Sequence, residues 1–366
     1  MILFSLNKQQ YDALAVLTNE VWYQTLLEEN NKNMKWLDYL QRGWEMTQQY
    51  IHDLGQQGMT VYITHHKCLE HNMGEGHPEG PERLAAIKDR LMAAQVFDFL
   101  HEVEAPEVSD AQLSRVHTPR YLSYLESVQP HVGTFRVDTD TAMNSATLEA
   151  ARRSAGAVVK AVDMVMNKQA PNAFCAIRPP GHHACSDKAM GFCFFNNVAI
   201  GAMHALSEHG LQRVAILDFD VHHGNGTEEI FKDDERVMLL SLFQHPFFPY
   251  SGDKALGSNP NIVNTPLKSG THGQEIREVV ADLWQYKLDE FQPQMVFISA
   301  GFDGHLEDDM GNFGLVESDY KWITERIVKW SKKWCEGRIV SVLEGGYELS
   351  SLARSVAVHV KVLADA

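Results

Sequence analysis

Residues 214–226 of this 366-residue chain read Val-Ala-Ile-Leu-Asp-Phe-Asp-Val-His-His-Gly-Asn-Gly. The four apolar residues at the start are typical of a strand buried on both faces of a parallel sheet. Side chains alternate along a strand, so Asp218, Asp220 and His222 are expected on one side. Ligands of α/β sheets bind beyond the carboxyl ends of the strands, and these polar side chains fall at that end.

The same stretch predicts a metal site. Two carboxylates and imidazoles that are buried together are costly unless a cation neutralises them. A mixed set of Asp and His ligands suits zinc. The alternative interpretation is a buried carboxylate pair bonded to the backbone, with His222 and His223 as ordinary core or surface histidines.

Composition indicates a globular protein. The chain is 44% hydrophobic and 22% charged, and its formal net charge is −16. This is enough for one large α/β domain with additions or for two smaller domains. Non-specific nucleic-acid binding is not expected, because phosphate contacts need clustered Lys and Arg. The negative charge is compatible with basic substrates such as lysine-rich tails or polyamines, or with a role in solubility alone.

The five cysteines include no CxxC pair. Their odd number and spacing favour reduced thiols and a cytoplasmic location. The apolar run at the start of the chain is too short for a signal peptide, although export without a cleavable signal stays open. No stretch approaches the 18 apolar residues of a membrane helix, so we expect no membrane partner.

Apolar strand patterns alternate with amphipathic helix patterns from residue 59 onward. This alternation predicts an α/β fold with a single parallel β-sheet flanked by helices on both faces. Strands are expected near 61–64, 173–177, 214–219, 237–242, 295–299 and 338–343. Helices are expected near 83–100, 111–127, 145–168, 195–209, 273–291 and 318–335.

Residues 1–58 differ from the rest in pattern. They have helical spacing, many Gln and Asn residues and no proline. We therefore predict a helical N-terminal extension that packs on the main domain, 59–366, or forms a contact between chains of an oligomer.

Residues that can bind a metal or accept a proton also follow two other expected strands. Asp303 follows the strand near 295–299 and supplies a third ligand beside Asp220 and His222. Three protein ligands leave one position open, which distinguishes catalytic from structural zinc. His182 and His183 follow Arg-Pro-Pro-Gly, and one of two adjacent imidazoles can act as a base near neutral pH. The alternative for the pair is a rigid loop with surface histidines.

Two further stretches are weaker signals. Glu344-Gly345-Gly346-Tyr347 brings a tyrosine hydroxyl that can stabilise an oxyanion, or one that is simply bonded to backbone. Aromatic residues at 191–197 and 247–249 can line an apolar slot for an alkyl chain, although each Phe alone is more often a core residue.

Taken in order and spacing, the motifs resemble those of the zinc-dependent histone deacetylases, within the arginase/deacetylase fold. The stretches that carry the resemblance are 77–84, 178–183, 191–193, 218–227, 299–303 and 344–347. Asn225 resembles the class II branch, since class I members usually have Asp at that position.

The resemblance implies a role for each matching residue. Asp220, His222 and Asp303 are implied to bind Zn²⁺. His183 is implied to be the general base and acid, with Asn225 as its buttress.

Further roles follow from the same resemblance. His182 is implied to give electrostatic support with Asp218 behind it, and Tyr347 to donate to the oxyanion. The substrate contacts are implied to be Gly191, Phe192, Phe248 and Met310. A structural K⁺ is implied at Asp218, Ser241 and Leu242.

The expected function is removal of acetyl groups from N6-acetyl-lysine in proteins or peptides. An acetylpolyamine deacetylase shares every catalytic residue and differs only at the rim. Polyamine-preferring relatives have a glutamate where this chain has Met310, which favours acyl-lysine, whereas Glu307 and Asp309 keep the polyamine alternative open. A catalytically silent acyl-lysine binding module is a third hypothesis, against which the intact His182, His183 and Tyr347 speak. An arginase-like dimanganese enzyme is disfavoured by the absence of an Asp-x-His-x-Asp pattern.

Overall fold

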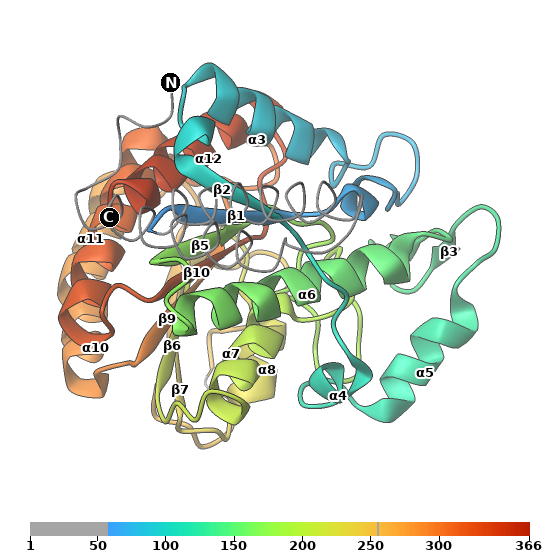
Figure 1. Ribbon diagram of the computed structural model, residues 1–366, viewed down its shortest axis with the longest axis horizontal. Helices are drawn as coiled ribbons and strands as arrows, with labels where there is room; N and C mark the ends of the chain where they lie inside the picture. Colours follow the sequence, from blue (N-terminus) through green and yellow to red (C-terminus); the bar gives the residue numbers. More distant parts are fainter. Residues whose placement is uncertain (1–57, 255) are drawn as a thin grey trace, which may run out of the picture. The chain divides into compact units, whose positions relative to one another are not determined.

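The computed structural model describes residues 58–254 and 256–366. Eight strands form one sheet in the order β2-β1-β5-β10-β9-β6-β7-β8 (Figure 1). Every pairing in this sheet is parallel. The strands are β1 (Thr60–Thr64), β2 (Leu100–Glu104), β5 (Asn172–Cys175), β6 (Val214–Asp218), β7 (Val237–Gln244), β8 (Ile262–Leu267), β9 (Met295–Ala300) and β10 (Ile339–Leu343). A separate antiparallel ribbon pairs β3 (Phe135–Arg136) with β4 (Ala142–Met143).

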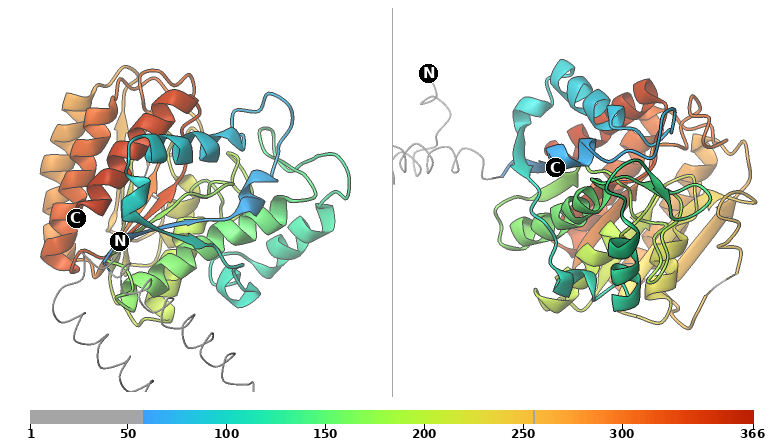
Figure 2. Two further views of the ribbon diagram at one scale, coloured as in Figure 1. Left: turned by 45° about the horizontal axis from the view of Figure 1, so that its top comes forward. Right: turned by 90° about the vertical axis from the view of Figure 1, so that its right-hand side faces the viewer.

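Helices cover both faces of the sheet, as the two views of Figure 2 show. One face is covered by α4 (Asp110–Leu113), α5 (Pro119–Val128), α6 (Thr147–Met166), α7 (Asn197–Ser207) and α8 (Asn225–Phe231). The other is covered by α3 (Glu82–Ala93), α9 (Gly273–Val279), the π-helical turn η3 (Val280–Trp284), α10 (Gln285–Phe291), α11 (Glu317–Trp334) and α12 (Leu349–Ala364). Short 3₁₀ turns lie at η1 (His66–Leu69) and η2 (Phe97–Phe99).

The two faces of the sheet form two separate hydrophobic cores. In β6, Val214 and Ile216 belong to the core under α6 and α7, whereas Ala215 and Leu217 belong to the core under α11 and α12. This is the alternation of a strand buried on both sides, and it explains the unbroken apolar run. The prediction of a single parallel sheet between two helical layers is confirmed.

Besides the short ribbon β3–β4, two strands of the main sheet escaped prediction, and both lie at its edges. β2 and β8 carry mixed sequences, and most of their side chains are only partly buried. Pro266 lies in β8, where an edge strand tolerates the missing N–H donor. The pattern rule for buried strands therefore does not detect either element.

Two predicted helices prove to be interrupted. The helix expected at 83–100 ends at Ala93, because Gln95 has a left-handed φ of 57° and the chain then turns into β2. The helix expected at 111–127 is divided into α4 and α5, and α5 begins anew at Thr118, whose hydroxyl caps it ahead of Pro119.

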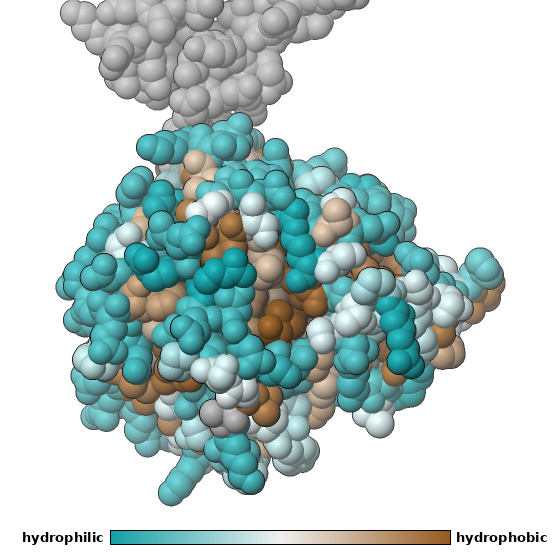
Figure 3. Space-filling model, turned by 90° about the horizontal axis from the view of Figure 1, so that it is seen from below, coloured by the Kyte–Doolittle hydropathy of each residue, from teal (hydrophilic) through white to brown (hydrophobic). Residues whose placement is uncertain are grey.

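The predicted N-terminal extension lies outside the described residues, apart from Gly58, and stays a prediction. Within the described parts of the chain, no helix has both the length and the apolar character needed to cross a membrane. On the face drawn in Figure 3, hydrophilic side chains predominate and hydrophobic ones emerge in small separate patches.

One polar side chain in the core should make stability depend on pH. His359 is fully buried; its Nδ1–H donates to the Thr324 hydroxyl (2.7 Å) and its Nε2 accepts from Ser341 (2.8 Å). Burial lowers the pKa of His359 from 6.5 to about 3. As pH falls below 6.5 the unfolded chain takes up a proton that the folded chain refuses, so stability is lost on acidification.

We expect His359 to contribute roughly 2–3 kcal/mol to the fall in unfolding free energy between pH 7.5 and pH 4.5. Urea unfolding of the wild type and of His359→Gln at both pH values measures this. The variant should be less stable at pH 7.5 and have the shallower pH dependence. An equal dependence in both proteins would contradict the prediction, and the exposed His66→Gln serves as control.

Candidate active site

Four neighbouring strands deliver the predicted site residues to one edge of the sheet. β5, β10, β9 and β6 are adjacent, and polar side chains follow the carboxyl end of each. His182 and His183 follow β5, Tyr347 follows β10, Asp303 follows β9, and Asp220 and His222 follow β6. Residues up to 165 positions apart in sequence, such as His182 and Tyr347, therefore meet at the position that parallel sheets reserve for ligands.

Asp220, His222 and Asp303 form a cluster of donor atoms. One ligating atom from each lies within 4.8 Å of the other two. His222 Nδ1 lies 3.1 Å from Asp220 Oδ1 and 3.2 Å from Asp303 Oδ2. The two carboxylates are fully buried, and no donor within residues 58–254 and 256–366 makes a hydrogen bond to Asp303 Oδ2.

This donor set fits a divalent cation. Burial, together with the nearby charge of Asp220, raises the pKa of Asp303 to about 6. Two adjacent buried carboxylates, one of them with an oxygen that no donor satisfies, are costly to keep ionised unless a cation lies between them. One nitrogen and two oxygen donors match the zinc ligands seen in proteins.

The two histidines that follow β5 have different environments. His182 Nδ1 lies 3.0 Å from Asp218 Oδ2, and His183 Nδ1 donates to Asn225 Oδ1 at 2.8 Å. Burial opposes a charge on His182, but the carboxylates of Asp220 and Asp218 outweigh it and raise the pKa to about 10. Burial, reinforced by the positive charge of His182, holds the pKa of His183 well below 6.5. The pair therefore combines a cationic imidazole with a neutral one that can accept a proton.

Arg83 holds the Gly-Gly-Tyr turn in place. Its Nε donates to the carbonyl of Gly346 (2.6 Å), and its Nη2 donates to the carbonyl of Glu344 (2.5 Å). The guanidinium also lies 4.9 Å from the centre of the Tyr347 ring. Arg83 is fully buried and pairs with the buried Glu79, so the turn rests on a rigid support.

Asp308 ties the loop after β9 to the same turn. Its Oδ2 accepts the backbone N–H groups of Tyr347 (2.6 Å) and Glu348 (3.0 Å), while its Oδ1 accepts that of Met310 (2.9 Å). Three donors that would otherwise lack partners are satisfied by one buried carboxylate.

A cavity of about 280 Å³ leads to the cluster of donor atoms. Its lining residues are Asp140, His183, Gly191, Phe192, His222, Phe247, Phe248, Asp309, Met310 and Tyr347. Phe248 lies edge-on to His183, with ring centres 5.2 Å apart, and Phe192 lies edge-on to Tyr347 at 5.8 Å. Aromatic walls around a polar end suit a substrate with an alkyl chain and a polar reacting group.

The predicted substrate contacts Gly191, Phe192, Phe248 and Met310 all line this cavity. Gly191 has a φ of +56°, and a Cβ there would come within 2.3 Å of His183 Cδ2, so only glycine fits beside the neutral imidazole.

Asp140 is the lining residue that sequence reasoning did not identify. Its Oδ1 accepts the backbone N–H of Gly191 at 3.2 Å, and the Thr141 hydroxyl donates to the same oxygen. Asp140 lies outside every stretch that carries the family resemblance. Asp138, two residues earlier, carries the same signal in sequence.

A parallel α/β sheet with a buried donor cluster, a neutral imidazole and an apolar channel at the ends of its strands is the arrangement of the arginase/deacetylase fold. The family model of the histone deacetylase domain matches residues 77–363 of this sequence. The crystal structure of the HDA15 HD domain superposes with a TM-score of 0.80 and 32% identity, covering 84% of this chain and 89% of that one.

Named relatives agree with this assignment. A probable deacetylase of Archaeoglobus fulgidus is 37% identical over 80% of this chain and 82% of its own length. The histone deacetylase-like amidohydrolase of Pseudomonas aeruginosa is 35% identical over 74% of this chain and 73% of its own length. Type-2 histone deacetylase 2 of Dictyostelium discoideum is 34% identical over 86% of this chain, which spans 21% of that protein. The chain belongs to the histone deacetylase family, and its likeness to type-2 members agrees with Asn225.

We expect removal of the Asp308 carboxylate to disturb Tyr347 without touching the donor cluster. Asp308→Ala leaves buried N–H groups unpaired, which should lower the free energy of unfolding by about 1–3 kcal/mol. A tyrosine displaced by an ångström should reduce turnover of an acetylated substrate roughly 10²-fold. Thermal unfolding and kcat measure the two effects. Asp309→Ala, which removes an exposed neighbour, is the matched control for stability; full activity in Asp308→Ala would contradict the expected role.

Proposed function

We propose that this chain is a zinc-dependent hydrolase that removes acetyl groups from N6-acetyl-lysine in proteins or peptides. The observation that carries the proposal is the convergence of three elements at the end of one apolar cavity. These are the donor cluster Asp220–His222–Asp303, the neutral imidazole of His183 and the hydroxyl of Tyr347.

Zn²⁺, when bound by Asp220, His222 and Asp303, would polarise the acyl carbonyl and make a bound water more acidic. The protein supplies the proton transfers. His183, held neutral and oriented by Asn225, takes the proton of the attacking water and later delivers it to the leaving amine. Cationic His182, supported by Asp218, stabilises the negative charge that develops beside it.

Tyr347 completes the proposed reaction centre. Tyr347 is among the residues that line the cavity, and within the described residues no hydrogen bond occupies its hydroxyl. It is therefore free to donate to the oxyanion that forms from the acyl carbonyl.

The cavity walls would hold the substrate in place. Phe192 and Phe248 would pack on its alkyl chain, and the carbonyl of Gly191 would accept an amide N–H. Asp140 would hold the substrate at the rim.

We also propose a structural K⁺ at Asp218, Ser241 and the carbonyl of Leu242. Asp218 and Ser241 are partners across the β6–β7 pairing. Both side chains are fully buried, and Ser241 Oγ has no hydrogen-bond partner in the described part of the chain, as expected of an oxygen that would ligate a cation.

An acetylpolyamine deacetylase is the second candidate, and one observation favours it. Asp140 and Asp309 both line the cavity, so two carboxylates are available to a cationic substrate. Met310, an apolar residue in the same lining, favours acyl-lysine, whose side chain carries no ammonium group.

Substrate competition tests the proposal. Deacetylation of an acetyl-lysine peptide and of N-acetylputrescine is measured side by side, with and without a zinc chelator. We expect peptide turnover that the chelator abolishes and zinc restores. A preference for N-acetylputrescine would keep the mechanism and overturn the substrate. Zinc binding without turnover of either would favour an acyl-lysine binding module.

Tyr347→Phe tests the oxyanion step. Loss of one such donor costs about 10²–10³ in rate, so kcat should fall by that factor. The thermal unfolding temperature should not change, because the hydroxyl makes no hydrogen bond in the described structure. Retained turnover in the variant would exclude the proposed role of Tyr347.

A further inference from the structure

A second group of metal-ligating side chains lies away from the proposed active site. Asp163, His204 and His209 bring one ligand atom each to within 4.8 Å of the others. Asp163 Oδ1 lies 2.8 Å from Nε2 of His204 and 2.8 Å from Nε2 of His209. These separations are as short as those within the cluster Asp220–His222–Asp303, where they are 3.1 and 3.2 Å.

The scaffold around Asp163, His204 and His209 favours a cation. Asp163 lies in the last turn of α6 and His204 in the last turn of α7, and His209 follows two residues after that helix ends. Helix C-termini carry a partial negative charge of about half an electron, which adds to the charge of the carboxylate. The side chain of His204 is 6% exposed and fixed by its surroundings, whereas Asp163 at 40% and His209 at 17% leave an opening to solvent.

We propose that Asp163, His204 and His209 form a second divalent-metal site, suited to Zn²⁺. Two imidazole nitrogens and one carboxylate oxygen are ligands that zinc prefers, and water can fill the position that faces solvent. A bound ion would connect α6 to the segment that leads from α7 into β6.

Arg115 sets the affinity of this site. Its Nη1 lies 3.5 Å from Nδ1 of His204, and its Nη2 pairs with Glu208. A metal on Nε2 of His204 requires the ring proton on Nδ1, where it would face a guanidinium instead of an acceptor. The side chain of Arg115 is a quarter exposed and can swing away, but its presence weakens binding.

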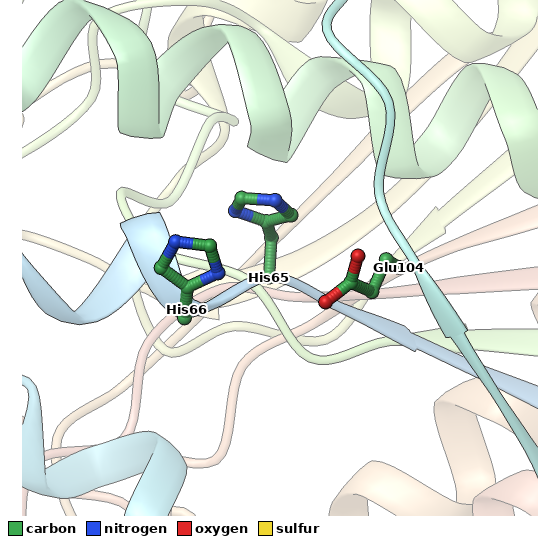
Figure 4. Close-up of side chains that lie close together, drawn as sticks. All are labelled: His65, His66 and Glu104. Atoms are coloured by element: carbon green, nitrogen blue, oxygen red, sulfur yellow. The ribbon is translucent and has the colours of Figure 1, made fainter.

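A third cluster makes a useful contrast and a matched control. His65, His66 and Glu104 also place ligand atoms within 4.8 Å, at the carboxyl ends of β1 and β2 (Figure 4). Nδ1 of His65 accepts the backbone N–H of Lys67 at 3.1 Å. That bond keeps the ring proton on Nε2 and cannot move aside, so this cluster is the poorer ligand set.

Metal content is the first test. The full chain, with its first zinc in place, is dialysed against buffered Zn²⁺ alone and the metal per chain is measured. We expect two ions in the wild type and in His66→Ala, and one in His209→Ala and Asp163→Asn. Deacetylase activity and far-UV circular dichroism of His209→Ala should match the wild type, because the cluster lies outside the cavity. One ion in the wild type, or two in folded His209→Ala, would overturn the proposal.

The affinity for Zn²⁺ is the second test. If Asp163, His204 and His209 only formed hydrogen bonds with one another, their substitution would not change this affinity. Calorimetric titration with Zn²⁺ should show affinity for the second ion lowered at least about tenfold in His209→Ala. In Arg115→Ala it should be raised, because the opposing guanidinium is gone. Unchanged or weaker binding in Arg115→Ala would contradict the assigned geometry. Neither readout depends on turnover, so failure here is separate from failure of the proposed deacetylase function.

Discussion

Negative charge buried at one edge of the sheet is the constraint on which the rest of the structure depends. Asp218, Asp220, Asp303 and Glu344 are all fully buried there. Unpaired, such charges would oppose folding by several kcal/mol each. Cationic His182 lies beside Asp218 and Asp220, and the backbone N–H groups of Gly181 and Gly345 donate to Glu344 and Asp220. The cluster Asp220–His222–Asp303 can in addition bind a cation. The proposed chemistry therefore uses buried carboxylates whose charge must be balanced for the protein to fold.

Close packing around these carboxylates requires glycine at two positions of the backbone beside them. A Cβ on Gly345 would come within 1.9 Å of Asp303 Oδ2, and one on Gly301 within 2.0 Å of Asp220 Oδ2. Both backbones lie directly against the carboxylates, so any side chain at these two positions would displace a residue of the donor cluster. Buried side chains also hold the turn that bears Tyr347 through its backbone. Arg83 donates to the carbonyl of Gly346, and Asp308 accepts the N–H of Tyr347.

The central strands and the polar residues that follow their carboxyl ends could be predicted because their signals are local. An apolar run followed by Asp, His or Gly-Gly-Tyr marks a strand end without knowledge of its neighbours, as the stretch from Val214 to Gly226 illustrates. The edge strands β2 and β8, the break at Gln95 and the role of Asp140 could not be predicted. Each depends on tertiary context: an exposed edge, a left-handed residue that is not glycine, or an aspartate that only its contact with Gly191 distinguishes from Asp138.

The order of the strands has a consequence for how the molecule is made. β10 is the last strand of the chain, yet it lies in the middle of the sheet between β5 and β9. Until residues 339–343 leave the ribosome, β5 and β9 present open edges to one another, and open edges invite pairing with other chains. The two halves of the sheet close only when β10 inserts, and the turn bearing Tyr347 arrives with it. Synthesis must therefore pass residue 347 before this edge of the sheet is complete, and a nascent chain stopped before β10 is the form most exposed to aggregation.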